Sequence, residues 1–146
     1  MNVSRSIITV LAVGLICVLC SAGQQSGTES VEITDPKSGD NVSWQFIVEG
    51  NSSATADSGL KVYVLIWPIE ANGPWWVQPT TTYSDGSWES NAYFGRDPSK
   101  FFEDIGTTYR IAAIMINGTL KEGETLRELP DVPKSARSEK ITVKRK

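Results

Sequence analysis

The sequence contains no histidine, and both of its cysteines, Cys17 and Cys20, lie close to its start. The lack of histidine excludes catalysis by Ser-His-Asp or Cys-His arrangements and nearly every zinc, copper or haem site. No glycine-rich loop precedes a helical segment, so the usual cradle for a nucleotide phosphate is also missing. We therefore expect neither a cofactor nor a metal ion.

An excess of positive charge is missing too. The chain has 14 basic and 17 acidic residues, which gives a formal net charge of −3. A nucleic-acid surface needs surplus lysine and arginine to displace the counterions of phosphates, so we expect no nucleic-acid partner. The short basic end, Lys144-Arg145-Lys146, predicts a solvated chain terminus, with a contact to an anionic lipid or polymer as the alternative.

The longest apolar run covers residues 7–20, follows the single charge of Arg5 and precedes the small residues Ser21 and Ala22. This layout predicts a secretory signal peptide, because the run is shorter than the roughly 20 residues that span a bilayer. We expect residues 1–22 to form a signal peptide helix, residues 23–30 a flexible tether, and residues 31–146 a single domain.

Cys20 leaves two alternatives open. Leu19-Cys20 partly resembles a lipoprotein box, in which the cysteine is acylated, although bulky Leu19 stands where glycine, alanine or serine is usual. An uncleaved leader would instead remain as an anchor. In every case we expect an extracytoplasmic protein, secreted or attached to the cell surface, that meets the membrane only through its leader or a lipid.

The rest of the chain predicts an all-β domain. Segments rich in β-branched and aromatic residues alternate with Gly, Pro, Asn and Asp clusters, as in a β-sandwich. Pro79 predicts an edge position for its strand, and Ser84-Asp85-Gly86-Ser87 predicts a hairpin turn. Only residues 122–129, in a long connection, have the spacing of a short helical turn. The predicted strands cover residues 31–34, 42–49, 60–67, 75–82, 88–94, 108–116 and 139–144.

Residues 104–113 resemble the corner before the sixth strand of immunoglobulin-like and fibronectin-type-III-like domains, where a tyrosine turns its hydroxyl back onto the preceding loop. Tyr109 matches that tyrosine, Gly106 would supply the tight backbone, and Ile111 replaces the second cysteine of true immunoglobulins. The resemblance implies a seven-stranded immunoglobulin-like β-sandwich without the inter-sheet disulfide. An ordinary buried tyrosine in a strand is the alternative.

Three further segments, residues 62–68, 75–79 and 85–88, are similar to a module of prokaryotic surface proteins, including those of methanogenic archaea. This similarity implies an extracytoplasmic sandwich and carries no activity with it.

Five tryptophans are more than the core of a small sandwich needs. Trp75 and Trp76 are adjacent, so in an extended strand their side chains point to opposite faces, and one of them can be exposed. Beside Tyr83 or Trp88, an exposed indole would offer a platform for a sugar ring. The alternatives are packing over a sheet edge and docking onto another protein.

Acidic residues allow two weaker hypotheses. Asp85 with Glu89, or Asp97 with Glu103 and Asp104, could supply the two carboxylates of a glycosidase, and the second group could supply oxygen ligands for calcium. Carboxylates in turns more often accept backbone hydrogen bonds or face water, and we favour that interpretation.

Three Asn-X-Ser/Thr patterns, at Asn41, Asn51 and Asn117, are candidate sites of N-glycosylation in an exported chain.

These observations favour a non-enzymatic exported or cell-surface module that contacts another protein or an envelope component through one sheet face or through its strand-end loops. A carbohydrate-binding module that uses its exposed tryptophans is the alternative, and a small carboxylate-based hydrolase is a third hypothesis.

The leader makes a direct prediction. Mass spectrometry of the exported protein should find an amino terminus at Gly23, because small residues precede that bond at the positions a signal peptidase reads. An acylated Cys20 at the amino terminus would show that a lipoprotein peptidase acts instead.

Overall fold

The computed structural model describes residues 29–146 apart from residues 55–57 and Asp85. The predicted signal peptide, Cys20 and most of the predicted tether therefore lie outside the described residues. Within the described part, no helix is long and apolar enough to cross a membrane.

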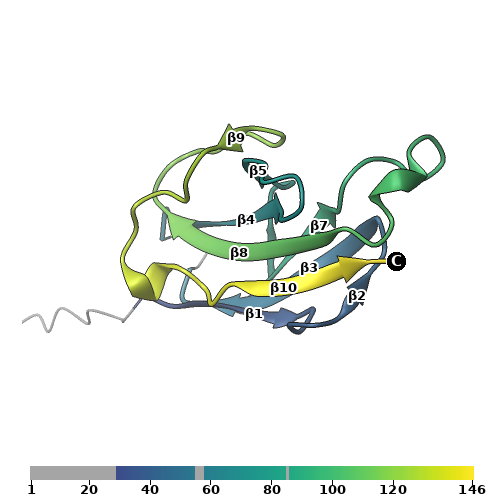
Figure 1. The fold of residues 1–146 in the computed structure, drawn as a ribbon. Coiled ribbons are helices and arrows are strands. Elements are labelled where there is room, and N and C mark those ends of the chain that lie inside the picture. The colour runs from purple at the N-terminus through teal and green to yellow at the C-terminus, as the bar shows by residue number, and fades with distance from the viewer. Residues whose placement is uncertain (1–28, 55–57, 85) are drawn as a thin grey trace, which may run out of the picture.

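The described chain folds into two β-sheets packed face to face (Figure 1), so the predicted all-β sandwich is confirmed. Every strand pair is antiparallel except β2 with β10, which is parallel. The four-stranded sheet has the order β1 (Val31–Asp35), β3 (Gln45–Ser52), β7 (Ser87–Tyr93), β6 (Thr82–Ser84). The six-stranded sheet has the order β2 (Asn41–Val42), β10 (Ile141–Arg145), β8 (Thr108–Ile116), β4 (Lys61–Pro68), β5 (Trp75–Val77), β9 (Thr125–Leu126).

Alternating side chains build the core between the two sheets. In β7, Trp88, Ser90 and Ala92 point inward and are buried, whereas the residues between them face solvent or the edge. They pack, with Phe94 and Val48, against the inward side chains of the six-stranded sheet. Five of the seven predicted strands appear within about two residues of their predicted bounds, as expected for a period of two.

The outer face of the six-stranded sheet is also buried. Leu65 of β4, Trp75 of β5 and Ile114 of β8 face away from the first core and form a second one. The long connection from β8 to β10, residues 117–140, passes over this face and supplies its cover (Figure 1), and four of its apolar residues, Leu120, Leu126, Leu129 and Val132, pack there. The short helical turn predicted within residues 122–129 is wrong, because β9 forms there and pairs with β5.

Two predicted strands are divided between the sheets. Residues 42–49 begin in β2 and continue as β3 of the other sheet after a local turn, in which the Ser43 hydroxyl donates to the Gln45 carbonyl. Residues 75–82 leave β5, cross between the sheets at Pro79, and enter β6. Proline has no N–H for a sheet ladder, and the Pro79 carbonyl accepts instead from the Ser90 hydroxyl at 2.8 Å.

The adjacent tryptophans test the sheet geometry. Trp75→Ala should lower the free energy of unfolding by about 3–5 kcal/mol, because it empties a buried site in the second core. Trp76→Ala should change it by no more than about 0.5 kcal/mol, since the Trp76 side chain is exposed. Urea unfolding of both variants measures the difference, and equal losses would contradict the assignment of opposite faces.

Candidate binding site

A cleft of about 590 Å³ opens where the ends of β4 and β5 lie beside the chain that follows β7. Pro68, Trp76, Pro79 and Tyr93 give it apolar walls, and the charged side chains of Glu70, Arg96, Asp104 and Glu122 line it as well. We call this hollow, defined by these eight residues, the aromatic cleft.

Of the four aromatic residues proposed as a ligand platform, only Trp76 lines the cleft. It is 44% exposed, whereas Trp75 and Trp88 are 1% and 2% exposed and pack in the two cores. Tyr83 is half-buried, and its hydroxyl accepts from the Val62 backbone N–H. The structure therefore does not bring the four together on one surface, because Trp75 and Trp88 occupy inward positions of their strands.

Tyr93 is another aromatic residue of the cleft, and the sequence pattern alone did not indicate it as a site residue. Its ring contacts that of Trp44, with ring centres 5.6 Å apart, and its hydroxyl accepts from Gln45 Nε2 at 3.1 Å. The sequence feature that could have indicated Tyr93 is its place in β7, where it alternates with the buried residues.

A cluster of charged groups closes one end of the cleft. Asp104 accepts hydrogen bonds from the backbone N–H, Nε and Nη2 of Arg96 at 2.7, 3.1 and 3.0 Å. On its other side, Asp104 Oδ2 lies 3.5 Å from Nη1 of Arg145, whose side chain is fully buried and which also donates to the Phe94 carbonyl at 3.0 Å. One carboxylate therefore lies between two guanidinium groups.

The burial of Arg145 corrects the prediction that residues 144–146 form a solvated chain end. Lys144 and Lys146 are exposed, but the strand alternates, and Arg145 points inward from β10. Its backbone also bonds to the β7–β8 loop, since the Gly106 N–H donates to the Arg145 carbonyl at 2.9 Å.

Tyr109, the candidate corner tyrosine, lies near the start of β8 and reaches the same cluster. It is 3% exposed, and its ring meets that of Phe94 edge to face at 5.6 Å. Burial, and then the negative charge of Asp104, raise the pKa of its hydroxyl, while Arg145 and hydrogen bonds oppose the shift.

Two glycines shape the backbone around this corner. Gly106 has a φ of +87°, in the region that favours glycine. At Gly95, with φ +81°, an added Cβ would lie 2.5 Å from the Tyr109 hydroxyl and 2.8 Å from Asp104 Oδ2. Tyr109, Asp104 and Arg145 can approach one another here because residue 95 has no side chain.

The acidic residues proposed for catalysis or calcium binding are engaged in other contacts. The hydrogen bonds from Arg96 lower the pKa of Asp104, and those from the Ser99 hydroxyl and backbone lower that of Asp97. Glu103 lies 3.6 Å from Arg96, and Glu89 accepts from the Thr82 hydroxyl at 3.1 Å. Asp85 lies outside the described residues. Among the residues that are described, no three His, Cys, Asp or Glu side chains gather as metal ligands.

Opposing effects act on the pKa of Glu70. Burial acts to raise its pKa, but hydrogen bonds from Thr108 and from its own backbone, together with the charge of Lys144, outweigh burial and lower the pKa. Both of its carboxylate oxygens lie 2.9 Å from the Thr108 backbone N.

The hydrogen bonds and the negative charge of Asp104 hold Arg96 in place, and they also raise the pKa of the Arg96 guanidinium.

The three candidate glycosylation sites, Asn41, Asn51 and Asn117, are all exposed. Asn51 Nδ2 donates to Glu32 Oε1 at 2.9 Å, so its amide nitrogen already has a partner.

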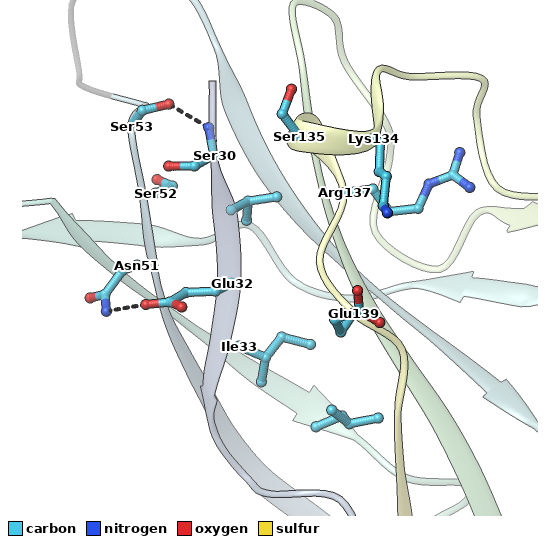
Figure 2. A pocket seen from close by; sticks show the side chains of 12 residues that line it. Ser30, Glu32, Ile33, Asn51, Ser52, Ser53, Lys134, Ser135, Arg137 and Glu139 are labelled. Carbon is cyan, nitrogen blue, oxygen red and sulfur yellow. Dashed lines mark hydrogen bonds between the residues drawn. The ribbon is translucent and has the colours of Figure 1, made fainter. Parts of the chain in front are cut away.

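A second hollow, of about 660 Å³, lies between β1 and the chain around η2 (Lys134–Ala136). Figure 2 shows that its polar side chains bond to one another along one wall, where Asn51 meets Glu32 and the Ser53 hydroxyl meets the Ser30 N–H. Val31, Ile33 and Ile141 supply its apolar surface, and no aromatic side chain lines it. The aromatic cleft is therefore the stronger candidate for a binding site.

No protein-family model and no curated protein sequence matches the chain. Among solved structures, the chain is similar to the endo-beta-1,4-mannanase from Thermotoga petrophila, with 12% sequence identity and a TM-score of 0.45. The similarity covers 85% of this chain and 21% of the mannanase chain, so the chain spans about a fifth of that enzyme's length. A similarity this low carries no argument about fold or activity.

The charged cluster predicts a pH-dependent contribution to stability. Asp104→Asn should cost about 3 kcal/mol at pH 7, because it leaves the buried Arg145 without its anion. The pKa of Asp104 is lowered in the folded state, so its stabilisation is complete above the unfolded pKa of about 3.9 and is lost as the pH falls through the folded value.

Urea unfolding of the wild type and Asp104→Asn at pH 7 and at pH 3 should therefore show a difference that shrinks at the lower pH. Glu103→Gln is the control, because this exposed ion pair should contribute little. A difference independent of pH would contradict the assignment.

Proposed function

We propose that the chain is an exported, non-enzymatic module with an immunoglobulin-like arrangement of strands, which binds a protein or another envelope component through the loops at one end. The order β1-β3-β7-β6 corresponds to strands A, B, E and D of an immunoglobulin domain, and β10-β8-β4-β5 corresponds to G, F, C and C′. The buried Tyr109 beside the β7–β8 loop supports the same comparison.

The concentration of exposed apolar side chains is the observation that carries the binding proposal. In the described part of the chain, five large hydrophobic side chains are exposed. Phe101, Phe102 and Ile105 are three of them, exposed by 38%, 71% and 55%, and all lie in the β7–β8 loop around η1 (Phe102–Asp104). This loop borders the aromatic cleft, which Trp76 lines, because Arg96 lines the cleft and its Cζ lies 4.2 Å from the centre of the Phe101 ring. Such a patch is typical of an interaction site.

The position of this loop also supports the proposal. In Figure 1, β1 begins at one end of the sandwich, and the loop that carries η1 projects from the other end, beside the C-terminal strand β10. A domain held at the surface by an N-terminal tether would therefore present the loop away from its attachment.

The sheet faces support binding less well. The connection of residues 117–140 covers the outer face of the six-stranded sheet. The outer face of the four-stranded sheet has mostly polar side chains, such as Glu49, Glu89 and Asn91, with Ile47 as its exposed large hydrophobic residue. Loop-mediated contact is therefore favoured over contact through a sheet face.

The direction of the carboxyl shifts argues against Glu70, Asp97 and Asp104 as the general acid of a glycosidase. A glycosidase needs a general acid whose pKa is raised, so that it remains protonated near neutral pH. The resolved shifts of Glu70, Asp97 and Asp104 are all downward.

A second candidate function is glycan binding, favoured by the exposed indole of Trp76 at the wall of a cleft. In this function a sugar ring would stack on the indole, and the charged side chains of the cleft would bind its hydroxyl groups.

The loop proposal predicts the behaviour of two substitutions made together. Phe102→Ser with Ile105→Ser should weaken binding to envelope fragments of the producing organism about tenfold or more, because buried apolar anchors dominate interface energies. Co-sedimentation of the protein with those fragments measures the loss.

Ile47→Ser is the matched control, since Ile47 is 50% exposed but lies on the outer face of β3. Equal losses in both variants, or no binding by the wild type, would contradict the proposal.

A further inference from the structure

The aromatic cleft has the surfaces that a long side chain with a charged tip requires. Trp76 and Tyr93 supply aromatic surface, and Pro68 and Pro79 add aliphatic surface. The contact with Trp44 and the hydrogen bond from Gln45 fix the position of Tyr93. The walls are thus built before any ligand arrives.

Several hydrogen-bond donors of the cleft are already used within the protein. Nε and Nη2 of Arg96 donate to Asp104. Gln78 uses both ends of its amide, since its Nε2 donates to the Trp76 carbonyl at 3.1 Å and its Oε1 accepts from the Tyr93 N–H at 2.8 Å. These three donor groups, Nε and Nη2 of Arg96 and Nε2 of Gln78, therefore have acceptors within the protein.

Acceptors remain available. Glu122 is exposed on the turn before β9, and neither a hydrogen bond nor an ion pair joins it to another described residue. Both oxygens of Glu70 lie 2.9 Å from the Thr108 backbone N, the Thr108 side chain and the backbone of Glu70 also bond to this carboxylate, and Glu70 remains exposed. Three acidic residues, Glu70, Asp104 and Glu122, and one basic residue, Arg96, line the cleft, and the buried Arg145 also pairs with Asp104, so these five groups carry a formal charge of −1.

We propose that the aromatic cleft binds a lysine or arginine side chain of the partner protein. These side chains carry donors and no acceptor, their apolar stems pack on aliphatic surface, and their cations bind aromatic ring faces. A neutral sugar, by contrast, carries no charge to complement the acidic side chains of the cleft. This inference rests on the proposed function, because it specifies the partner that binds at this end of the sandwich.

The test uses small probes with matched stems. The ¹H–¹⁵N spectrum of the protein is followed during titration with N-acetyl-lysine amide and N-acetyl-arginine amide. The controls are N-acetyl-norleucine amide, N-acetyl-citrulline amide and a neutral cello-oligosaccharide. We expect saturable shifts around Trp76, Tyr93 and Glu122 with the two cationic probes, weakened by added salt. The uncharged analogues should bind at least tenfold more weakly.

Variants then identify the groups that bind. Trp76→Ala should abolish the saturable shifts of the cationic probes, and Glu122→Gln should weaken binding about threefold, the effect of an exposed ion pair. Glu49→Gln removes an exposed carboxylate from the outer face of β3 and should change nothing. Equal binding of arginine and citrulline probes, preferential binding of the oligosaccharide, or indifference to Trp76→Ala would overturn the inference.

The two proposals fail in different ways. If Phe102→Ser with Ile105→Ser abolishes envelope binding but Trp76→Ala and Glu122→Gln leave it unchanged, loop docking stands and the cationic site is wrong. If the wild type binds no envelope fragment, the proposed function is wrong, whatever the probes show.

Discussion

The pairing of β4 with β8 is the constraint on which the rest of the structure depends. Both strands are apolar on both faces, and their register places Leu65 beside Ala112 and Ile66 beside Ile111. A sheet centre of this kind has to be covered twice, because exposing either face would leave a large apolar surface in water. The four-stranded sheet covers one face, and residues 117–140 cover the other. The long connection is therefore part of the core.

This double cover explains how the aromatic cleft arises. Trp75 points into the outer core, where its ring meets that of Trp67 at 5.3 Å, so Trp76 has to point the other way. At that side of β5 the chain leaves for the other sheet at Pro79, and Trp76 and Pro79 both line the aromatic cleft there. An indole that cannot enter either core is thus placed at the wall of a hollow.

The sequence predicts those features of the fold that depend on residues close together in the chain. The period of two is local, so the strands, the all-β sandwich and the opposite faces of Trp75 and Trp76 could be predicted. The change of sheet between Val42 and Gln45, the pairing of β9 with β5, and the burial of Arg145 depend on partners far away in the chain. The cleft was missed for the same reason, because Tyr93 and Glu122 come from segments that only the fold brings together.

The Arg96–Asp104–Arg145 cluster links fold and surface. Nε and Nη2 of Arg145 lack hydrogen-bond partners among the described residues, so the buried cation is costly, and removing its anion Asp104 would leave that charge uncompensated. The cluster nevertheless attaches the β7–β8 loop to β10 at one point, with Arg96 bonded to Asp104 and stacked on Phe101. Holding that loop in one conformation reduces the entropy lost when Phe102 and Ile105 meet a partner. Both guanidinium groups pair with Asp104, whereas no ion pair joins Glu122 to another described residue, so Glu122 is the carboxylate of the cleft that is open to a cationic ligand.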